Sequence, residues 1–197
     1  MSDRPEFPAD LVLTTERLTI RPLGDSDVDA IVVAARDPLT QQWLPLPRPY
    51  LADHARGFVH DIASAAQSSG GGLIRGIESE GRLAGAIDFK ATDWRNGETE
   101  IGYWTHPAFR GRGIMVEAVT AMAHYALTEA GLQRVVLRIA PGNAPSARVA
   151  EKAGFTREGV ARNAGFIHDG RVDLVIYSLI RPDVLQRELK PAGGSRV

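Results

Sequence analysis

Hydrophobic and polar positions along the chain follow two different periods. In residues 11–22 apolar and charged residues alternate, which predicts an opening β segment. In residues 28–36 the apolar positions recur at helical spacing, so we expect a helix that packs by one face. Residues 51–66 are compatible with a second helix, and the glycine- and serine-rich stretch 68–72 predicts a flexible connection after it.

Three short runs with strand character come next, at Leu73–Glu78, Arg82–Phe89 and Glu100–Thr105. Turn residues separate them, as in an antiparallel meander. A long amphipathic helix is then predicted for Met115–Ala130, with Gly131 ending it. Its apolar stripe consists of Val116, Val119, Met122, Ala123, Ala126 and Leu127.

A short β-branched run, Val135–Ile139, follows the long helix. Its brevity and apolar density predict a central strand parallel to the one before the helix, in a β-α-β unit. A shorter helix at Pro145–Ala153 and a hairpin complete the pattern, with strands from about Thr156 and at residues 171–180.

The hairpin is expected to turn at Asp169–Gly170, and the tail from about Lys190 is expected to be disordered. Runs of strands mixed with helices, without a repeat or a linker between them, predict one mixed α/β domain of the α+β class. Most of its sheet should be antiparallel, with one parallel pair at the centre.

Composition narrows the possible functions. The chain has 197 residues, of which 44% are hydrophobic and 24% charged, so it can bury one ordinary core. Its formal net charge of −1 argues against a nucleic-acid partner. The absence of cysteine excludes disulfides, thiolate metal sites and cysteine nucleophiles. Without metal-ligand clusters, an apolar leader or a run of roughly 20 apolar residues, we expect a cytoplasmic protein with no metal and no membrane contact.

The stretch Arg110–Met115 carries the clearest chemical signal. Gly111 and Gly113 interrupt it where the long helix begins. A helix start leaves N–H groups unpaired and carries partial positive charge, while glycines permit positive φ and a close anion. With Arg110 and Arg112 alongside, the stretch predicts a phosphate-binding loop. A tight turn with two solvated arginines fits the same residues, and neither a P-loop nor a complete dinucleotide motif is present.

Residues 38–49 contain four prolines and therefore cannot be regular helix throughout. Trp43 lies within this segment and Tyr50 directly follows it. Two interpretations remain open. The segment could be a rigid loop that covers the core, or it could form one wall of an acceptor cleft, for which aromatic residues on a stiff loop are well suited.

The order of elements is more specific than any single motif. A strand, Arg110–Gly113, a long helix, an apolar strand, Asn143–Ser146 and then Glu151–Phe155 resemble the GNAT superfamily of N-acetyltransferases. The likeness covers residues 12–182, which leaves 1–11 as an N-terminal extension and 183–197 as a C-terminal tail.

Within that superfamily, four segments are similar to the RimJ/RimL branch of ribosomal-protein N-terminal acetyltransferases. They are the opening residues 13–23, the Trp43–Pro45 loop, residues 100–104 and the Asp169–Gly170 hairpin. The resemblance implies a GNAT-type domain with a twisted, mostly antiparallel sheet, a splayed parallel strand pair and helices on both faces. It also implies acetyl-coenzyme A as co-substrate.

The coenzyme's pyrophosphate would lie on the backbone amides of residues 110–115. Ile114 and Met115 complete that motif, and the Met115 side chain would have to point away from the phosphate. The strand end that contains Trp104, Thr105 and His106 would diverge from the Val135–Ile139 strand.

The pantetheine arm would lie in the resulting opening. Asn143 would hydrogen-bond that arm, cap the following helix, or do both.

Acyl transfer to an amine requires a neutral amine, a donor to the thioester oxygen and a proton for the leaving thiolate. Glu100 is the best-placed carboxylate to take the amine proton, directly or through water. Glu98 lies on the same strand face and competes with it, and either could be a solvated charge. The superfamily's usual tyrosine acid falls at Ala150, and RimL-like sequences suggest Ser146 instead, which could also be a capping hydroxyl.

The expected acceptor is a primary amine, such as a protein or peptide N-terminus, bound by Trp43, Tyr50 and Phe166. Asp169 and Asp173 on the hairpin could favour a cationic acceptor. An acyltransferase for small-molecule amines, a coenzyme-A-binding regulatory module without turnover and a generic nucleotide binder remain alternatives. The chain could be a monomer or a homodimer.

Overall fold

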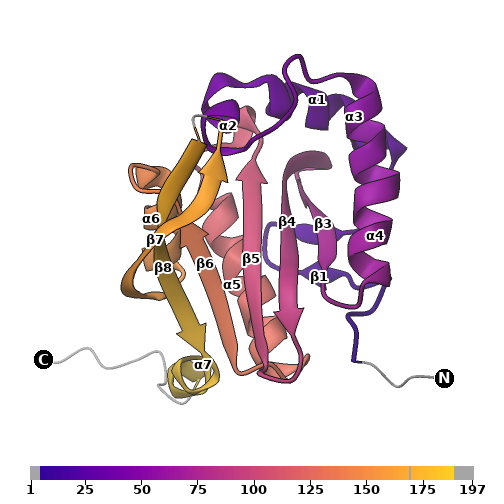
Figure 1. Cartoon of the computed structure of the whole chain (residues 1–197). Coiled ribbons are helices and arrows are strands. Elements are labelled where there is room, and N and C mark those ends of the chain that lie inside the picture. The colour runs from indigo at the N-terminus through magenta and orange to yellow at the C-terminus, as the bar shows by residue number, and fades with distance from the viewer. Residues whose placement is uncertain (1–4, 169, 189–197) are drawn as a thin grey trace, which may run out of the picture.

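A computed structural model describes residues 5–168 and 170–188. Within them the chain forms one eight-stranded sheet in the order β1-β2-β3-β4-β5-β6-β8-β7 (Figure 1). Of its described strand pairs, only β5–β6 is parallel. The predicted fold class is therefore confirmed. The strands are β1 (Leu13–Thr14), β2 (Thr19–Arg21), β3 (Leu73–Ser79), β4 (Arg82–Asp93), β5 (Glu98–Thr105), β6 (Arg134–Ile139), β7 (Thr156–Ile167) and β8 (Gly170–Ile180).

Helices cover both faces of the sheet, with α5 and α6 on one face and α1 and α3 on the other. The four predicted helices are confirmed, and a π-helical turn at Phe58–Ile62 joins α3 to α4. The helices are α1 (Val28–Arg36), α2 (Pro38–Trp43), α3 (Ala52–Gly57), α4 (Ala63–Ser68), α5 (Ile114–Thr128), α6 (Ala144–Lys152) and α7 (Arg181–Glu188).

Two local predictions need correction. The opening β segment is two short antiparallel strands, β1 and β2, rather than one. The proline-rich segment begins with a helix, α2, because Pro38 fits the first helical turn and the Asp37 side chain accepts a hydrogen bond from the Thr40 amide. The predicted turn residue Asp169 and the tail from Lys190 lie outside the described residues.

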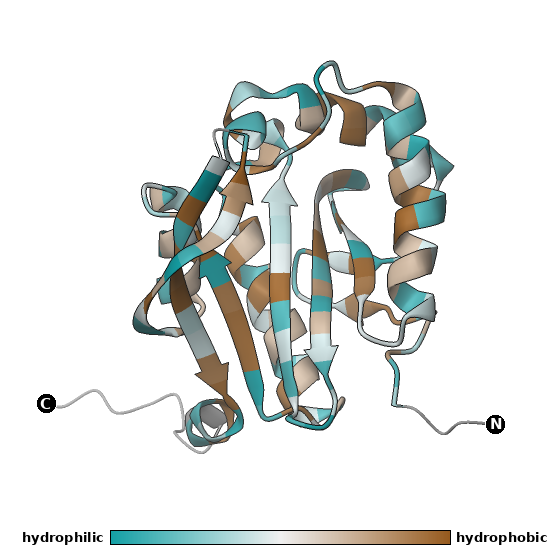
Figure 2. Ribbon diagram, viewed as in Figure 1, coloured by the Kyte–Doolittle hydropathy of each residue, from teal (hydrophilic) through white to brown (hydrophobic). Residues whose placement is uncertain are grey.

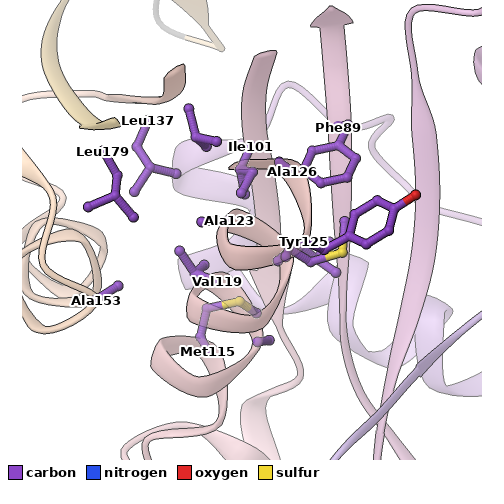
Figure 3. Packing of buried hydrophobic residues seen from close by; sticks show 14 of the residues in the cluster. Phe89, Ile101, Met115, Val119, Ala123, Tyr125, Ala126, Leu137, Ala153 and Leu179 are labelled. Carbon is purple, nitrogen blue, oxygen red and sulfur yellow. The ribbon is translucent and has the colours of Figure 1, made fainter. Parts of the chain in front are cut away.

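The main core lies between α5 and the sheet. Figure 3 shows Val119 and Ala123 of α5 on the side of the helix that faces Ile101 and Leu137 of the sheet. The predicted apolar stripe of α5 is buried except for Val116, which is only half-buried. Segments beyond residues 12–182 also contribute to this core, since Phe7 stacks on Phe89 with ring centroids 4.6 Å apart and Val184 of α7 is buried. Burying a phenylalanine side chain stabilises the fold by roughly 1.5–3 kcal/mol.

A smaller core cluster fills the space between α1, α3 and the other sheet face. Ile31 and Ala35 of α1 pack there with Ala55 and Val59, and Tyr50 is buried among them. This cluster holds the segment after α2 against the sheet.

Strands β5 and β6 diverge near their middle. They pair from Glu98↔Arg134 only as far as Glu100↔Val136. Beyond that point β5 stays paired with β4, and β6 stays paired with β8 through Ile139↔Val175. Beyond this point the backbone N–H and C=O groups on the facing edges of β5 and β6 therefore do not hydrogen-bond to one another. In Figure 2 the end of β5 beyond the divergence is pale, whereas the middle of β6 is brown.

Candidate active site

A cavity of about 800 Å³ opens where β5 and β6 diverge. Its walls come from both strands, the glycine loop before α5, the start of α6, α2 and the β7–β8 hairpin. This volume is within the usual range for small-molecule sites. Of the predicted site residues, it brings together Trp43, Glu100, Trp104, Thr105, Arg110, Gly111, Gly113, Ile114, Met115, Asn143, Ser146 and Phe166.

Three predicted site residues do not line this cavity. Tyr50 is only 5% exposed and lines a smaller adjoining cavity instead. His106 is buried, and its Nδ1 accepts a hydrogen bond from the Ala108 amide at 3.2 Å. Burial, together with neighbouring arginines, lowers the pKa of His106. Arg112 points elsewhere, as described below.

The glycine loop, predicted to bind phosphate, leads into the first turn of α5 through two residues with positive φ. Gly111 and Gly113 have φ values of 75° and 78°, and Gly113 is the residue that precedes the first turn of α5. Both glycines therefore use the positive φ that their lack of a Cβ permits. Ile114 and Met115 are buried, and Met115 points into the core (Figure 3), so its size does not obstruct the loop.

The two arginines of the loop are engaged elsewhere. Arg110 donates hydrogen bonds to Asp37 Oδ2 at 2.6 Å and to Thr40 Oγ1 at 2.9 Å. The Arg112 guanidinium lies 5.3 Å from the centre of the Phe109 ring and 3.6 Å from Glu80. In this arrangement the loop offers an anion mainly its backbone amides and the N-terminal end of α5.

Arg17 is a further cation at the loop that the sequence did not indicate. Its guanidinium donates to the Arg112 carbonyl at 3.1 Å and pairs with Glu117 in the first turn of α5. Burial of the Glu117 carboxyl opposes ionisation, but hydrogen bonds from Thr15 and Arg17 lower its pKa overall. No sequence signal links Arg17 to the loop, because the two segments are far apart in the chain.

Ser146 makes its side-chain contact with a tyrosine. The Tyr103 hydroxyl and Ser146 Oγ are 2.8 Å apart, and either can donate. Burial raises the pKa of Tyr103 to about 12. Asn143 caps α6 by accepting the Ser146 amide hydrogen at 3.2 Å, so the serine hydroxyl is not needed as a cap. Ala150, where the superfamily's tyrosine would stand, is fully buried. Tyr103 was missed, although its position on β5 could have suggested it.

Glu100 lies in the wall of the cavity between two cations. Its carboxylate oxygens are 3.2 Å from Lys90 Nζ and 3.6 Å from Arg138 Nη1. Glu98 instead pairs with Arg134 at 2.6 Å and does not line the cavity. Of the two competing carboxylates, only Glu100 is at the candidate site.

The hairpin contributes an aromatic residue to the rim. Phe166 is 64% exposed and lines the cavity. Asp173 accepts a hydrogen bond from the Asn163 amide at 2.7 Å, where a bulge interrupts the β7–β8 ladder. Its carboxylate is thus used within the hairpin. A side chain at Gly165 would collide with Leu174.

Residues 5–168 and 170–188 contain no group of three or more His, Asp or Glu side chains that could hold a metal ion. None of the helices within these ranges has the length and apolar character needed to cross a bilayer.

Comparison with known proteins identifies the family to which this fold belongs. Residues 17–156 match the family described as the acetyltransferase (GNAT) domain. The chain belongs to the GNAT family. A Bacillus subtilis protein that bears the name putative ribosomal N-acetyltransferase YdaF is 32% identical over 84% of this chain and 92% of its own length. The ribosomal-protein-serine acetyltransferase of Escherichia coli is 34% identical over 53% of this chain and 58% of its own length.

A solved structure of a RimL enzyme gives the same result in three dimensions. That protein, a ribosomal L7/L12 alpha-N-protein acetyltransferase in complex with coenzyme A, has a TM-score of 0.75 and 27% identity. The similarity covers 86% of this chain and 98% of RimL. This GNAT protein is therefore an N-acetyltransferase of the RimJ/RimL-like branch.

Proposed function

We propose that this enzyme transfers an acetyl group from acetyl-coenzyme A to a primary amine by direct attack in a ternary complex. The observation that carries the proposal is the single cavity between the diverging strands. It extends from Gly111 and Gly113 at the start of α5 to Ser146 and Glu100. The proposed anion site, the opening between the strands and the proposed acid–base groups thus line one continuous space.

The donor would bind with its pyrophosphate on the amides of the glycine loop and its pantetheine arm along the unpaired edges of β5 and β6. Asn143 lines the same cavity and would hydrogen-bond that arm. The coenzyme A bound to the RimL relative supports this assignment. A free backbone N–H of β5 beyond Glu100 could donate to the thioester oxygen, a role that preorganised amides perform well.

In the transfer step the amine nitrogen attacks the thioester carbon, the C–S bond breaks and the sulfur leaves as a thiolate. Ser146 would give its hydroxyl proton to that thiolate and regain one from Tyr103, whose hydroxyl is 2.8 Å away, and the Tyr103 phenolate would then take a proton from water. With its pKa near 12, the Tyr103 phenol is protonated at neutral pH. The serine and tyrosine together would replace the tyrosine that is absent at position 150.

Glu100 would remove the proton that the amine loses. Both of its oxygens already face cations, so it reaches the acceptor through a water molecule or after one ion pair opens. Lys90 and Arg138 would then stabilise its charge when the cycle restarts.

Direct transfer is proposed because the chain lacks the residues for an acyl-enzyme. It has no cysteine. Ser146 contacts Tyr103 and Asn143, and neither is a base of the kind that activates a serine nucleophile. Mass spectrometry of the enzyme with acetyl-coenzyme A alone should detect no acetyl adduct. An adduct on Ser146 that an amine discharges would contradict direct transfer.

The acceptor is proposed to be the N-terminus of a protein or peptide. The names of the YdaF, Escherichia coli and RimL relatives support this class, and Trp43 and Phe166 offer aromatic contacts at the cavity. Thiol release from acetyl-coenzyme A should be measured with peptides that begin with Ser, Ala or Met, and with polyamines, aminoglycosides and lysine analogues. Turnover confined to a polyamine or aminoglycoside would exclude the peptide acceptor, and coenzyme A binding without any turnover would favour a regulatory module.

A further inference from the structure

A smaller cavity of about 240 Å³ adjoins the acetyl-transfer cavity. The two cavities share lining residues from α2, from the segment directly after it and from β5, among them Thr40, Leu44, Gly102 and Trp104. Ligand sites for whole small molecules usually measure 300–1,000 Å³, so this cavity is of the size for one side chain or a similar group.

The walls of the smaller cavity are mostly apolar. Ile31 and Ala35 come from α1, Ile74 from β3, and Phe58 and Tyr50 from the segments on either side of α3. Several of these residues belong to the smaller core cluster, so packing holds the walls in place. An aliphatic group that leaves water for this space would gain about fourfold in affinity per buried methylene.

One carboxylate, that of Asp88, stands in this apolar wall. Asp88 pairs with Gly102 in the β4–β5 ladder, and its Oδ1 occupies the space that a Cβ on Gly102 would need. Because Gly102 lines both cavities, the carboxylate lies at the boundary between them. Lys90 Nζ lies beside the same position, 2.8 Å from where that Cβ would be, so the carboxylate and this ammonium group meet at the boundary.

Among the described residues Asp88 forms no ion pair within 4 Å, and Lys90 is the cation that lies near it. The nearby Lys90 ammonium pairs with Glu100 at 3.2 Å. Burial raises the pKa of Asp88, while Lys90 and the Gly102 amide act in the opposite direction. Lys90 only partly offsets the desolvation of this carboxylate, and a bound ammonium group would offset it further.

We propose that the smaller cavity is the acceptor specificity pocket, with Asp88 binding the ammonium group and the apolar walls enclosing the side chain next to it. The substrate class is a primary amine with an aliphatic group on the adjacent carbon, such as a peptide that begins with Leu, Ile or Met. This inference rests on the proposed acetyl transfer to an amine. Peptides with a small polar N-terminal residue should be poorer acceptors, because they would leave the apolar cavity unfilled. Polyamines should also be poorer acceptors, because their further ammonium groups would contact its apolar walls.

The test compares three acceptors, Leu-Gly-Gly, Ser-Gly-Gly and Asp-Gly-Gly, by thiol release from acetyl-coenzyme A. We expect kcat/KM for Leu-Gly-Gly to exceed that for the other two at least tenfold. Ala35→Leu fills the pocket and should abolish this preference. Leu46 lines only this cavity. Leu46→Ala enlarges the pocket and should shift the preference toward Phe-Gly-Gly. The exposed α4 substitution Ala65→Leu is the matched control.

Asp88 is tested separately by Asp88→Asn, which keeps the shape and removes the charge. The acceptor KM should rise about tenfold, with the Kd for coenzyme A within twofold of the parent value. Asp53→Asn, at an exposed carboxylate outside both cavities, should change neither quantity.

Two results would overturn the pocket while leaving acetyl transfer intact. They are equal use of the three peptides and an unchanged preference in both Ala35→Leu and Leu46→Ala. If no peptide is acetylated, calorimetry with coenzyme A present decides the matter. If Leu-Gly-Gly binds more tightly than Ser-Gly-Gly and this difference is lost in Ala35→Leu, the pocket is supported although the proposed reaction has failed. Equal binding of the two peptides would refute both the pocket and the proposed reaction.

Discussion

Arg110 Nη2 of the glycine loop lies 2.6 Å from Asp37 Oδ2 at the start of α2. The same carboxylate oxygen accepts the Thr40 amide hydrogen at 2.9 Å and so caps α2, the helix that ends at Trp43. The hydrogen bond from Arg110 lowers the pKa of Asp37. One carboxylate thereby joins the loop proposed to bind the donor to the helix proposed to contact the acceptor.

Replacing Asp37 with Asn should separate its two roles. Asparagine caps helices about as well as aspartate, so α2 should remain folded. Arg110 would lose its charged partner and could turn toward the pyrophosphate, which should tighten coenzyme A binding by up to about tenfold, the equivalent of one charge-assisted hydrogen bond of roughly 1.5 kcal/mol. Calorimetric titration measures the effect, with Asp53→Asn as control. Weaker binding in Asp37→Asn would mean that the ion pair itself orders the loop.

Gly113→Val should remove the coenzyme A site by blocking approach to the loop amides. Acetyl-coenzyme A at 100 times its Kd should stabilise the parent enzyme by roughly 2.7 kcal/mol, and the variant should lose most of that gain in a thermal-shift assay. Gly131→Val is the matched control, because Gly131 also has positive φ, at 77°, beyond the other end of α5. Both variants should lose intrinsic stability through backbone strain. An undiminished ligand shift in Gly113→Val would place the coenzyme elsewhere.

Ser146 and Tyr103 should behave as one unit. Ser146→Ala is expected to lower kcat by about 10²–10⁴-fold with little change in coenzyme A affinity. Tyr103→Phe should also lower kcat, and the double variant should be little worse than Ser146→Ala alone, since both substitutions interrupt the same proton path. If Ser146→Ala destabilises the protein and leaves kcat intact, the hydroxyl has only a structural role.

Trp43 should influence the acceptor more than the donor. Its ring lies 3.6 Å from the position of a Cβ on Gly142, so it reaches across the cavity to the loop before α6. Its buried Nε1 has no hydrogen-bond partner among the described residues. Trp43→Ala should raise the acceptor KM and leave coenzyme A affinity nearly unchanged, whereas Trp43→Phe should retain the aromatic contact. Equal steady-state constants for Trp43→Ala and the parent would remove this residue from the site.

Glu158 should make folding stability sensitive to acid. Hydrogen bonds from Arg134 and Ser178 lower its pKa from 4.5 to about 2. A carboxyl with a depressed folded pKa contributes stability above its unfolded pKa, and that contribution is lost as pH falls from about 4.5 toward 2. Glu158→Gln should therefore lower Tm at pH 7 and flatten the fall in Tm over this range. The α6 surface variant Glu151→Gln should show the parent slope, and a parent-like slope in Glu158→Gln would contradict the assignment.

The amino-acid sequence by itself determined the elements whose signals are local. The helix at Val28–Arg36, the strand at Arg134–Ile139 and the helix start at Gly113 follow from periodicity, caps and glycines within a few residues of one another. The glycine loop belongs to this group, because its chemistry depends on backbone that its own residues shape. Met115 also points into the core, away from the loop, as its position in the first turn of α5 predicted.

The tertiary structure decided which side chains converge. Arg110 sits beside Asp37, Tyr103 beside Ser146 and Asp88 over Gly102, and each of these contacts joins separate elements of the fold. Tyr50 turned inward because the cluster around α1 and α3 buries it, which nothing in its proline-rich surroundings indicates. Strand and helix periods assign a residue to a face, but only the packing of one element on another determines what that face meets.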